Sequence, residues 1–165
     1  MLVEALDLLV AELRHLQRHG PSFVISHRFA QDNFCVPGEE ISAVELACDG
    51  NTFQLHLALA QRFVFDYLAH HRRIALDSLQ IVSGLTGDWF YRDHAANSEH
   101  PQPKKILRPT VRVIVQRIRD AMEVAFAKAQ VKLDPHDVLR SCPAEGSKRV
   151  LYKLCADVRW HHTSR

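Results

Sequence analysis

The chain has 165 residues, 47% of them hydrophobic, which is enough for one domain with a core, or for a small domain with terminal additions. No apolar run approaches the roughly 20 residues that cross a bilayer, and residues 1–20 carry three acids and no basic stretch before their leucines. We therefore expect no membrane span, no secretory leader and a cytoplasmic location.

The formal net charge of +2 conceals an uneven distribution along the chain. Residues 1–100 contain 7 Lys and Arg against 13 Asp and Glu, a balance of −6, whereas residues 101–165 contain 14 against 6, a balance of +8. Because concentrated positive charge attracts a phosphate backbone, the C-terminal part is the expected location of any nucleic-acid contact. The alternative is a domain whose charge is segregated without such a partner.

The first segment is predicted to be a helix over residues 1–20, ended by Gly20-Pro21. Its leucines recur at spacings of four, three, four and three, which places on one side Leu2, Leu6, Leu9, Leu13 and Leu16. This leucine seam either pairs two copies of the chain as a homodimer or packs on its own domain, residues 21–165. Both alternatives stay open at this point.

Short β-prone runs follow at Ser22–Ser26, Ile41–Ala47 and Thr52–Leu57, and the turn Asp49-Gly50-Asn51 predicts a hairpin between the last two. Apolar residues at helical spacing then predict a first core helix from Leu59 to His71. Asp77 is the expected N-cap of a second helix, which ends near Gly84.

Residues 86–105 are predicted to form a long connection, since they combine glycine and prolines with Trp89, Phe90 and Tyr91. These aromatic rings could stack on single-stranded bases, although lids over a small core are the commoner arrangement. The longest predicted helix runs over residues 109–130, with Pro109 in its first turn. A β-hairpin over residues 138–154 comes next, followed by a short C-terminal tail.

The helix at 109–130 has two distinct faces. One arc is apolar and is predicted to face the core, with Val111, Ile114, Val115, Ile118 and Met122. The other displays Arg112, Val113, Gln116, Arg117, Arg119 and Asp120. Arginine bonds guanine, glutamine bonds adenine and a small apolar group contacts the thymine methyl, so this set suits the major groove of DNA. A solvated helix face is the plainer interpretation.

The order of these elements, and two motifs within them, resemble the winged helix-turn-helix output domain of OmpR/PhoB-type response regulators. The stretch from Pro109 to Arg119 is similar to the family's recognition helix, which has Thr-Val, alternating apolar residues and then Arg-Leu-Arg, where this chain has Arg-Ile-Arg. Residues 150–154, Val-Leu-Tyr-Lys-Leu, resemble the returning strand of its wing. The resemblance covers residues 22–154 and also takes in the sheet edge and first helix at 53–79. It implies an α+β fold with an N-terminal antiparallel sheet, three core helices and a C-terminal β-hairpin wing, here preceded by an extra N-terminal helix.

The resemblance implies that the protein binds double-stranded DNA sequence-specifically as a transcriptional regulator, and this is the function we expect. The base-facing positions are then Arg112, Val113, Gln116 and Arg117. The expected phosphate contacts are Lys104, Lys105, Arg108, Arg119, Lys148 and Arg149. The departures expected from the family are the absence of a receiver domain, a longer recognition helix, an enlarged wing turn and the missing Thr and Glu at the start of the first helix. Control would then come from partner binding, such as transcription machinery or another regulator, from the protein's amount, or through the leucine seam.

The sequence contains few motifs that would indicate an enzyme or a metal-binding protein. There is no GxSxG elbow, HExxH pair or Gly-rich phosphate loop, so we expect no enzyme and no cofactor. The cysteines Cys35, Cys48, Cys142 and Cys155 stand singly, which favours buried free thiols over a metal site. The main alternative function is a winged-helix adaptor for protein partners, and a further one is RNA binding or DNA architecture without sequence preference.

Overall fold

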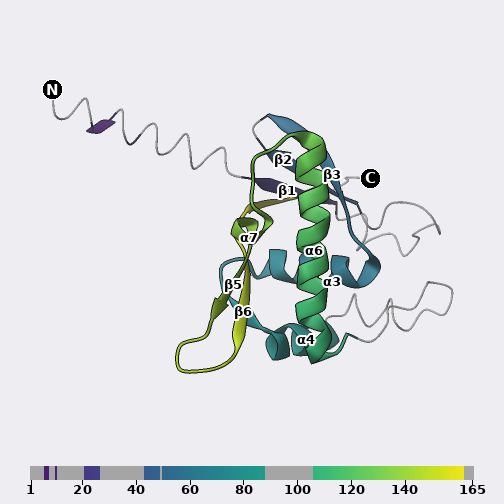
Figure 1. The fold of residues 1–165 in the computed structure, drawn as a ribbon, viewed down its shortest axis with the longest axis vertical. Coiled ribbons are helices and arrows are strands. Elements are labelled where there is room, and N and C mark those ends of the chain that lie inside the picture. The colour runs from purple at the N-terminus through teal and green to yellow at the C-terminus, as the bar shows by residue number, and fades with distance from the viewer. Residues whose placement is uncertain are drawn as a thin grey trace.

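The computed structural model describes residues 21–26, 43–48, 50–87 and 106–161, together with residues 6, 7 and 10, whose backbone is helical. This described part is a mixed α+β fold with four helices and two sheets (Figure 1). In chain order the elements are β1 (Ser22–Ser26), β2 (Ala43–Cys48), β3 (Asn51–His56), α3 (Leu59–His70), β4 (Leu76–Asp77), α4 (Ser78–Gly87), α6 (Arg108–Ala129), α7 (Pro135–Val138), β5 (Leu139–Pro143), β6 (Val150–Leu154) and β7 (Asp157–His161).

The first sheet has the strand order β3-β2-β1-β7. The predicted hairpin is confirmed: Cys48 pairs with Asn51, and Gly50 between them has a φ of +79°, a conformation that glycine adopts without strain. The prediction of a C-terminal tail is wrong in part, because residues 157–161 form β7, which pairs in parallel with β1. The sheet is therefore mixed, and not antiparallel throughout as predicted, because a strand close to the C-terminus joins the three antiparallel N-terminal strands.

One face of this sheet packs against the helices. Phe23, Val44, Leu46 and Leu55 are buried there, in agreement with the alternation expected of a sheet with one solvated face. The ring of Phe23 meets Phe65 of α3 edge-on at a centroid distance of 5.0 Å. The core is therefore continuous from the sheet into the helices.

The step from α3 to α4 is confirmed as predicted, and its cap is complete. The Asp77 carboxylate accepts from the Gln80 backbone N–H at 2.8 Å, and the Gln80 side chain accepts from the Asp77 N–H at 2.9 Å. This reciprocal capping box fixes the start of α4. Helix α4 ends at Gly87, so it runs three residues further than the predicted Gly84.

Helix α6 also forms where the sequence predicts it. Pro109 lies in its first turn, and the predicted apolar stripe is buried along its whole length: Val111, Ile114, Val115, Ile118 and Met122. The helix ends at Ala129, because the C-cap residue Gln130 takes a left-handed conformation with a φ of 55°.

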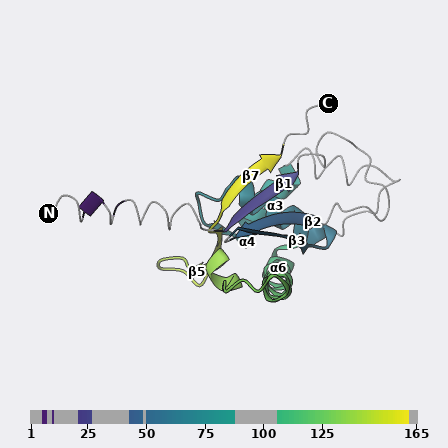
Figure 2. The ribbon, with the colours of Figure 1, turned by 90° about the horizontal axis from the view of Figure 1, so that it is seen from above.

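The second sheet has the order β4-β6-β5, so the short strand before α4 pairs with the returning strand of the hairpin. The hairpin begins at Leu139 instead of the predicted Val138, because Asp134 and Pro135 start the single turn of α7. Figure 1 shows the first sheet at one end of the molecule, and α4, the start of α6 and the hairpin tip at the other. In Figure 2, which is seen from above, α6 is viewed end-on beside the layer formed by the first sheet. None of the described helices combines the length and the apolar composition that crossing a bilayer requires.

Candidate nucleic-acid interface

The solvent-facing side of α6 carries the four residues predicted to face bases. Arg112, Val113, Gln116 and Arg117 are all exposed, and Val113 leaves half of its surface, 50%, in solvent. Arg108 is exposed in the first turn of the same helix. The Gln116 amide donates to the Asp120 carboxylate at 2.9 Å, which holds the glutamine side chain along the helix. The exposed side is therefore basic in its N-terminal half.

Arg119 differs from the prediction, which placed it on the exposed face as a phosphate contact. Its side chain is buried, with 8% exposed, because a residue four positions after Val115 is rotated only about 40° from it on a helix. Burial lowers the pKa of Arg119, while Tyr152 and Asp134 act in the opposite direction. Arg119 is therefore an internal structural residue and is removed from the proposed contact surface.

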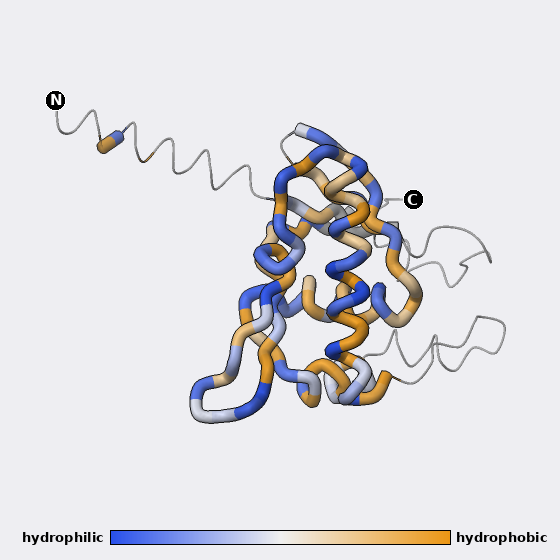
Figure 3. The backbone as a smooth tube through the Cα atoms, in the orientation of Figure 1, coloured by the Kyte–Doolittle hydropathy of each residue, from blue (hydrophilic) through white to orange (hydrophobic). Residues whose placement is uncertain are grey.

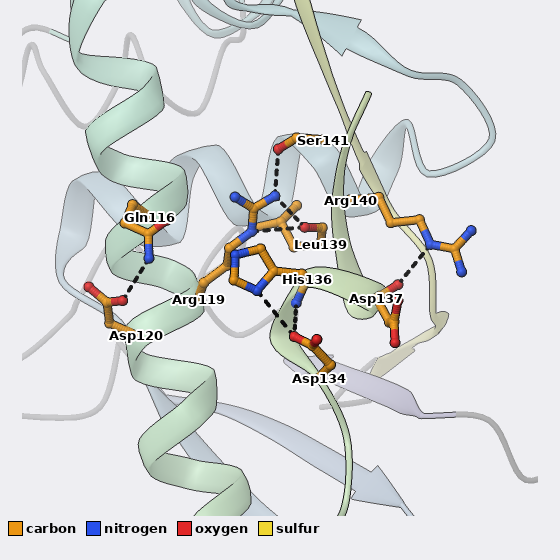
Figure 4. Close-up of polar contacts among 9 residues, drawn as sticks. All are labelled: Gln116, Arg119, Asp120, Asp134, His136, Asp137, Leu139, Arg140 and Ser141. Carbon is orange, nitrogen blue, oxygen red and sulfur yellow. Dashed lines mark hydrogen bonds and ion pairs between the residues drawn. The ribbon is translucent and has the colours of Figure 1, made fainter. Parts of the chain in front are cut away.

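The Arg119 guanidinium joins α6 to the first residues of the hairpin (Figure 4). Nε and Nη2 donate to the Leu139 carbonyl at 2.9 and 2.6 Å, and Nη2 also donates to the Ser141 hydroxyl. The backbone of Cys155 donates to the Val138 carbonyl, and that of Ala144 donates to the Arg149 carbonyl. Residues 138, 140, 142 and 144 are therefore the ones that form backbone hydrogen bonds with residues 149–155, and Leu139 is not. In that register the Leu139 carbonyl points away from β6. Arg119 thus satisfies a buried acceptor on the outer edge of β5.

A second contact holds the other end of the hairpin. Arg149 Nη1 lies 3.4 Å from Asp77 Oδ2, so the carboxylate that caps α4 also contacts the hairpin. The Arg149 side chain is still 59% exposed. Lys148 beside it is exposed and makes no ion pair within the described part of the chain. Of the two predicted phosphate contacts in the hairpin, Arg149 therefore has an internal carboxylate partner, whereas Lys148 has none among the described residues.

Between α6 and β5, the turn α7 is fixed by its own cap. The Asp134 carboxylate accepts from the His136 backbone N–H at 2.8 Å and lies 3.1 Å from His136 Nδ1. These two hydrogen bonds, the backbone one foremost, lower the pKa of Asp134. The cap sets the direction in which the chain leaves α6 and enters the hairpin.

Part of each predicted group of site residues lies at one end of the molecule, because Arg108, Arg112 and Val113 are in the first turns of α6, whereas Gln116 and Arg117 lie near its middle. The hairpin tip and the start of α6 both lie opposite the first sheet (Figure 1), and the tip is hydrophilic (Figure 3). Lys104 and Lys105 lie outside the described residues, as do the rings at 89–91 and four of the five seam leucines. The remaining one, Leu6, is 58% exposed.

The cysteines are only partly as expected. Cys48 is buried, as predicted, but Cys142 is exposed in β5 and Cys155 is partly buried, because both lie on the hairpin or just after it. Cys35 is outside the described residues. Within the described ranges, no three His, Cys, Asp or Glu side chains come close enough together to hold a metal ion.

No family model, curated protein or solved structure matches the chain. The residues and their arrangement therefore carry the functional assignment. Two features of that arrangement were missed from the sequence: the bond from Arg119 to the hairpin and the contact between Asp77 and Arg149. The first had a signal in the 40° rotation from Val115, whereas the second joins residues 72 positions apart and left none.

Proposed function

We propose that this protein binds double-stranded DNA sequence-specifically as a winged helix-turn-helix protein. In this proposal α4 and α6 are the helix-turn-helix, α6 is the recognition helix and the β5–β6 hairpin is the wing. The observation that carries the proposal is the exposed basic start of α6 beside a hydrophilic hairpin, both at one end of the molecule. The major groove admits an α-helix presented in this way.

The order of the elements supports the same proposal. Helices α3, α4 and α6 precede the hairpin, and β4 pairs with the hairpin's returning strand. This pairing anchors the hairpin next to α4 instead of leaving it to project alone. The pairing supports the arrangement that the sequence resemblance implies, although the sheet before the first helix is extended here by the parallel strand β7.

The exposed side chains of α6 suit base reading by their chemistry. Arg112 and Arg117 can each donate two hydrogen bonds to guanine O6 and N7, and Gln116 can bond adenine. Val113 offers a small apolar contact for a thymine methyl. Arg108 in the first turn of α6 and Lys148 in the hairpin are exposed and are proposed to contact phosphates. Arg149 is proposed to do the same, although it also contacts Asp77.

Charge favours DNA over the alternative of a protein adaptor. An adaptor needs no excess of arginine on α6, whereas a phosphate backbone requires it. A homodimer through the leucine seam is part of the proposal, and the exposure of Leu6 leaves that position accessible to a second copy. Regulation of transcription is the proposed biological role.

The decisive experiment starts by selecting bound fragments from random duplex DNA, followed by titrations at several salt concentrations. Arg117→Ala is expected to cost about 1–3 kcal/mol on the selected site and much less on random DNA, since a base contact is lost. Lys148→Ala should weaken both kinds of DNA alike and reduce the salt slope by about one unit. If Arg112→Ala and Arg117→Ala change neither affinity nor specificity in folded protein, the adaptor becomes the better explanation.

A further inference from the structure

The hairpin has an outer face, directed away from α6, that carries two opposed cations. Arg140 of β5 pairs directly with Lys153 of β6, so their side chains leave the sheet on the same side. Because the pairs 138/155 and 144/149 are hydrogen-bonded and such pairs recur at every second residue, Arg140 and Lys153 are also a hydrogen-bonded pair, with Cα atoms about 5.5 Å apart. Like charges directly opposite each other destabilise a strand pair. The fold therefore retains a repulsive pair at the base of the hairpin.

Neither cation is neutralised within the described part of the chain. The only hydrogen bond of the Arg140 side chain there runs from Nε to the Asp137 backbone carbonyl at 3.2 Å, so the carboxylate of Asp137 is not its partner. Figure 4 shows Arg140 on the side of β5 opposite Arg119 and α6. Arg140 is exposed and Lys153 is partly exposed. Both charges are available to an external anion.

The same face continues toward the tip of the hairpin. Ala144 bonds Arg149, so Arg149 follows Lys153 on this face at a distance of four residues, or about 13 Å along the strand. On the other side of β6, the antiparallel pairing of β4 brings the turn with exposed Arg73 toward the Lys153 end. Of these cations, Arg149 has a carboxylate partner, Asp77. On the outer face the uncharged pair Cys142–Leu151 therefore separates Arg149 from the cations at the base of the hairpin, and only those at the base have no carboxylate partner among the described residues.

We propose that Arg140 and Lys153 bind the phosphate backbone of DNA that flanks the sequence contacted by α6. This inference rests on the proposed function and extends it to a second contact surface. The two cations are separated from the hairpin tip by the length of β6, so they reach DNA beyond the part that the tip contacts. An anion between them removes the repulsion that the free protein tolerates.

The test compares two duplexes containing the selected site: one trimmed to the site, the other extended by about one helical turn of 10 base pairs on one side, with each side tried in turn. The variant is Arg140→Gln/Lys153→Gln. The control, Lys128→Gln/Lys132→Gln, removes the same charge from exposed lysines at the end of α6 and just beyond it. Circular dichroism establishes that both variants are folded.

Wild type and control should bind more tightly when one side is extended, with a salt slope about 1.8 units steeper for two further phosphate contacts. Their advantage on the extended duplex should then fall about 12-fold between 50 and 200 mM salt. The Arg140→Gln/Lys153→Gln variant should bind the trimmed site normally and lose this gain.

Three results would overturn the inference. If extension brings no gain in wild type, or if the variant keeps the whole gain, the outer face does not contact DNA although the proposed function stands. If wild type binds no duplex, the proposed function fails and this inference fails with it.

Discussion

Replacing Arg119 with methionine tests whether α6 holds the hairpin in place. Methionine has similar length but no donor, so Arg119→Met removes the two bonds to the Leu139 carbonyl and the one to Ser141. Leu139 is fully buried, and its carbonyl points away from β6, so it would lose these donors inside the protein. An unsatisfied buried acceptor costs about 1–3 kcal/mol.

One effect acts in the opposite direction. The buried guanidinium is desolvated, as its lowered pKa indicates, and methionine removes that cost. We therefore expect a net loss of about 2 kcal/mol in the free energy of unfolding. For a chain of this size, that corresponds to a fall in Tm of about 4–8 °C.

Urea denaturation followed by circular dichroism measures the change, because the shift in midpoint multiplied by the slope gives the difference in free energy. Arg117→Met is the matched control, since it makes the same replacement two residues earlier at an exposed position and should change stability by less than about 0.5 kcal/mol. Equal midpoints for Arg119→Met and wild type, or a more stable Arg119→Met, would refute the structural role assigned to this arginine.

Three further predictions concern other contacts. A methyl group at Gly84 would overlap the Tyr67 ring, so Gly84→Ala should destabilise the protein although alanine favours helix by about 1 kcal/mol; stabilisation in urea would contradict this packing. Asp77→Asn keeps an oxygen for the cap of α4 but removes the carboxylate that pairs with Arg149. In DNA titrations this variant should bind DNA more tightly than wild type, whereas Arg149→Ala should bind it more weakly. Effects of the same sign would show that Arg149 acts on the hairpin's position and not on phosphates. If the leucine seam pairs two chains, replacing Leu9 and Leu13 with lysine should halve the mass measured by light scattering with the domain still folded, and a monomeric wild type would exclude this dimer.

Local patterns predicted much of the fold because they depend on neighbours in sequence. The five apolar residues of α6 recur at helical spacing, and all five are buried. Asp77 was predicted as a cap from its residue type alone, and the glutamine three residues later completes the box. The β2–β3 hairpin was likewise predicted from its alternation and its turn, where Gly50 takes the positive φ.

The parts that could not be predicted depend on long-range pairing. Strand β7 forms only because β1, more than 130 residues earlier, offers an edge in parallel register, and its short alternating sequence did not distinguish it from a tail. Arg119 is charged like the residues of the exposed face of α6, but on the helix it lies at the border between the exposed and the buried face. Its residue type therefore suggested an exposed position, whereas the side chain is buried. The role of an arginine at such a border depends on what packs beside it, in this case the first residue of β5.

The two internal contacts of the hairpin together bear on how it would meet DNA. Arg119 holds its first strand to the middle of α6, and Asp77 meets Arg149 at its far end, so the hairpin is tied to two different helices. A surface fixed before binding loses less conformational entropy on association than one that is ordered by its ligand. The contact with Asp77 is the weaker of the two, because it is longer and half exposed, and it competes with any phosphate for Arg149. The base of the hairpin is therefore expected to keep its position on binding DNA, while its tip exchanges an internal carboxylate for an external phosphate.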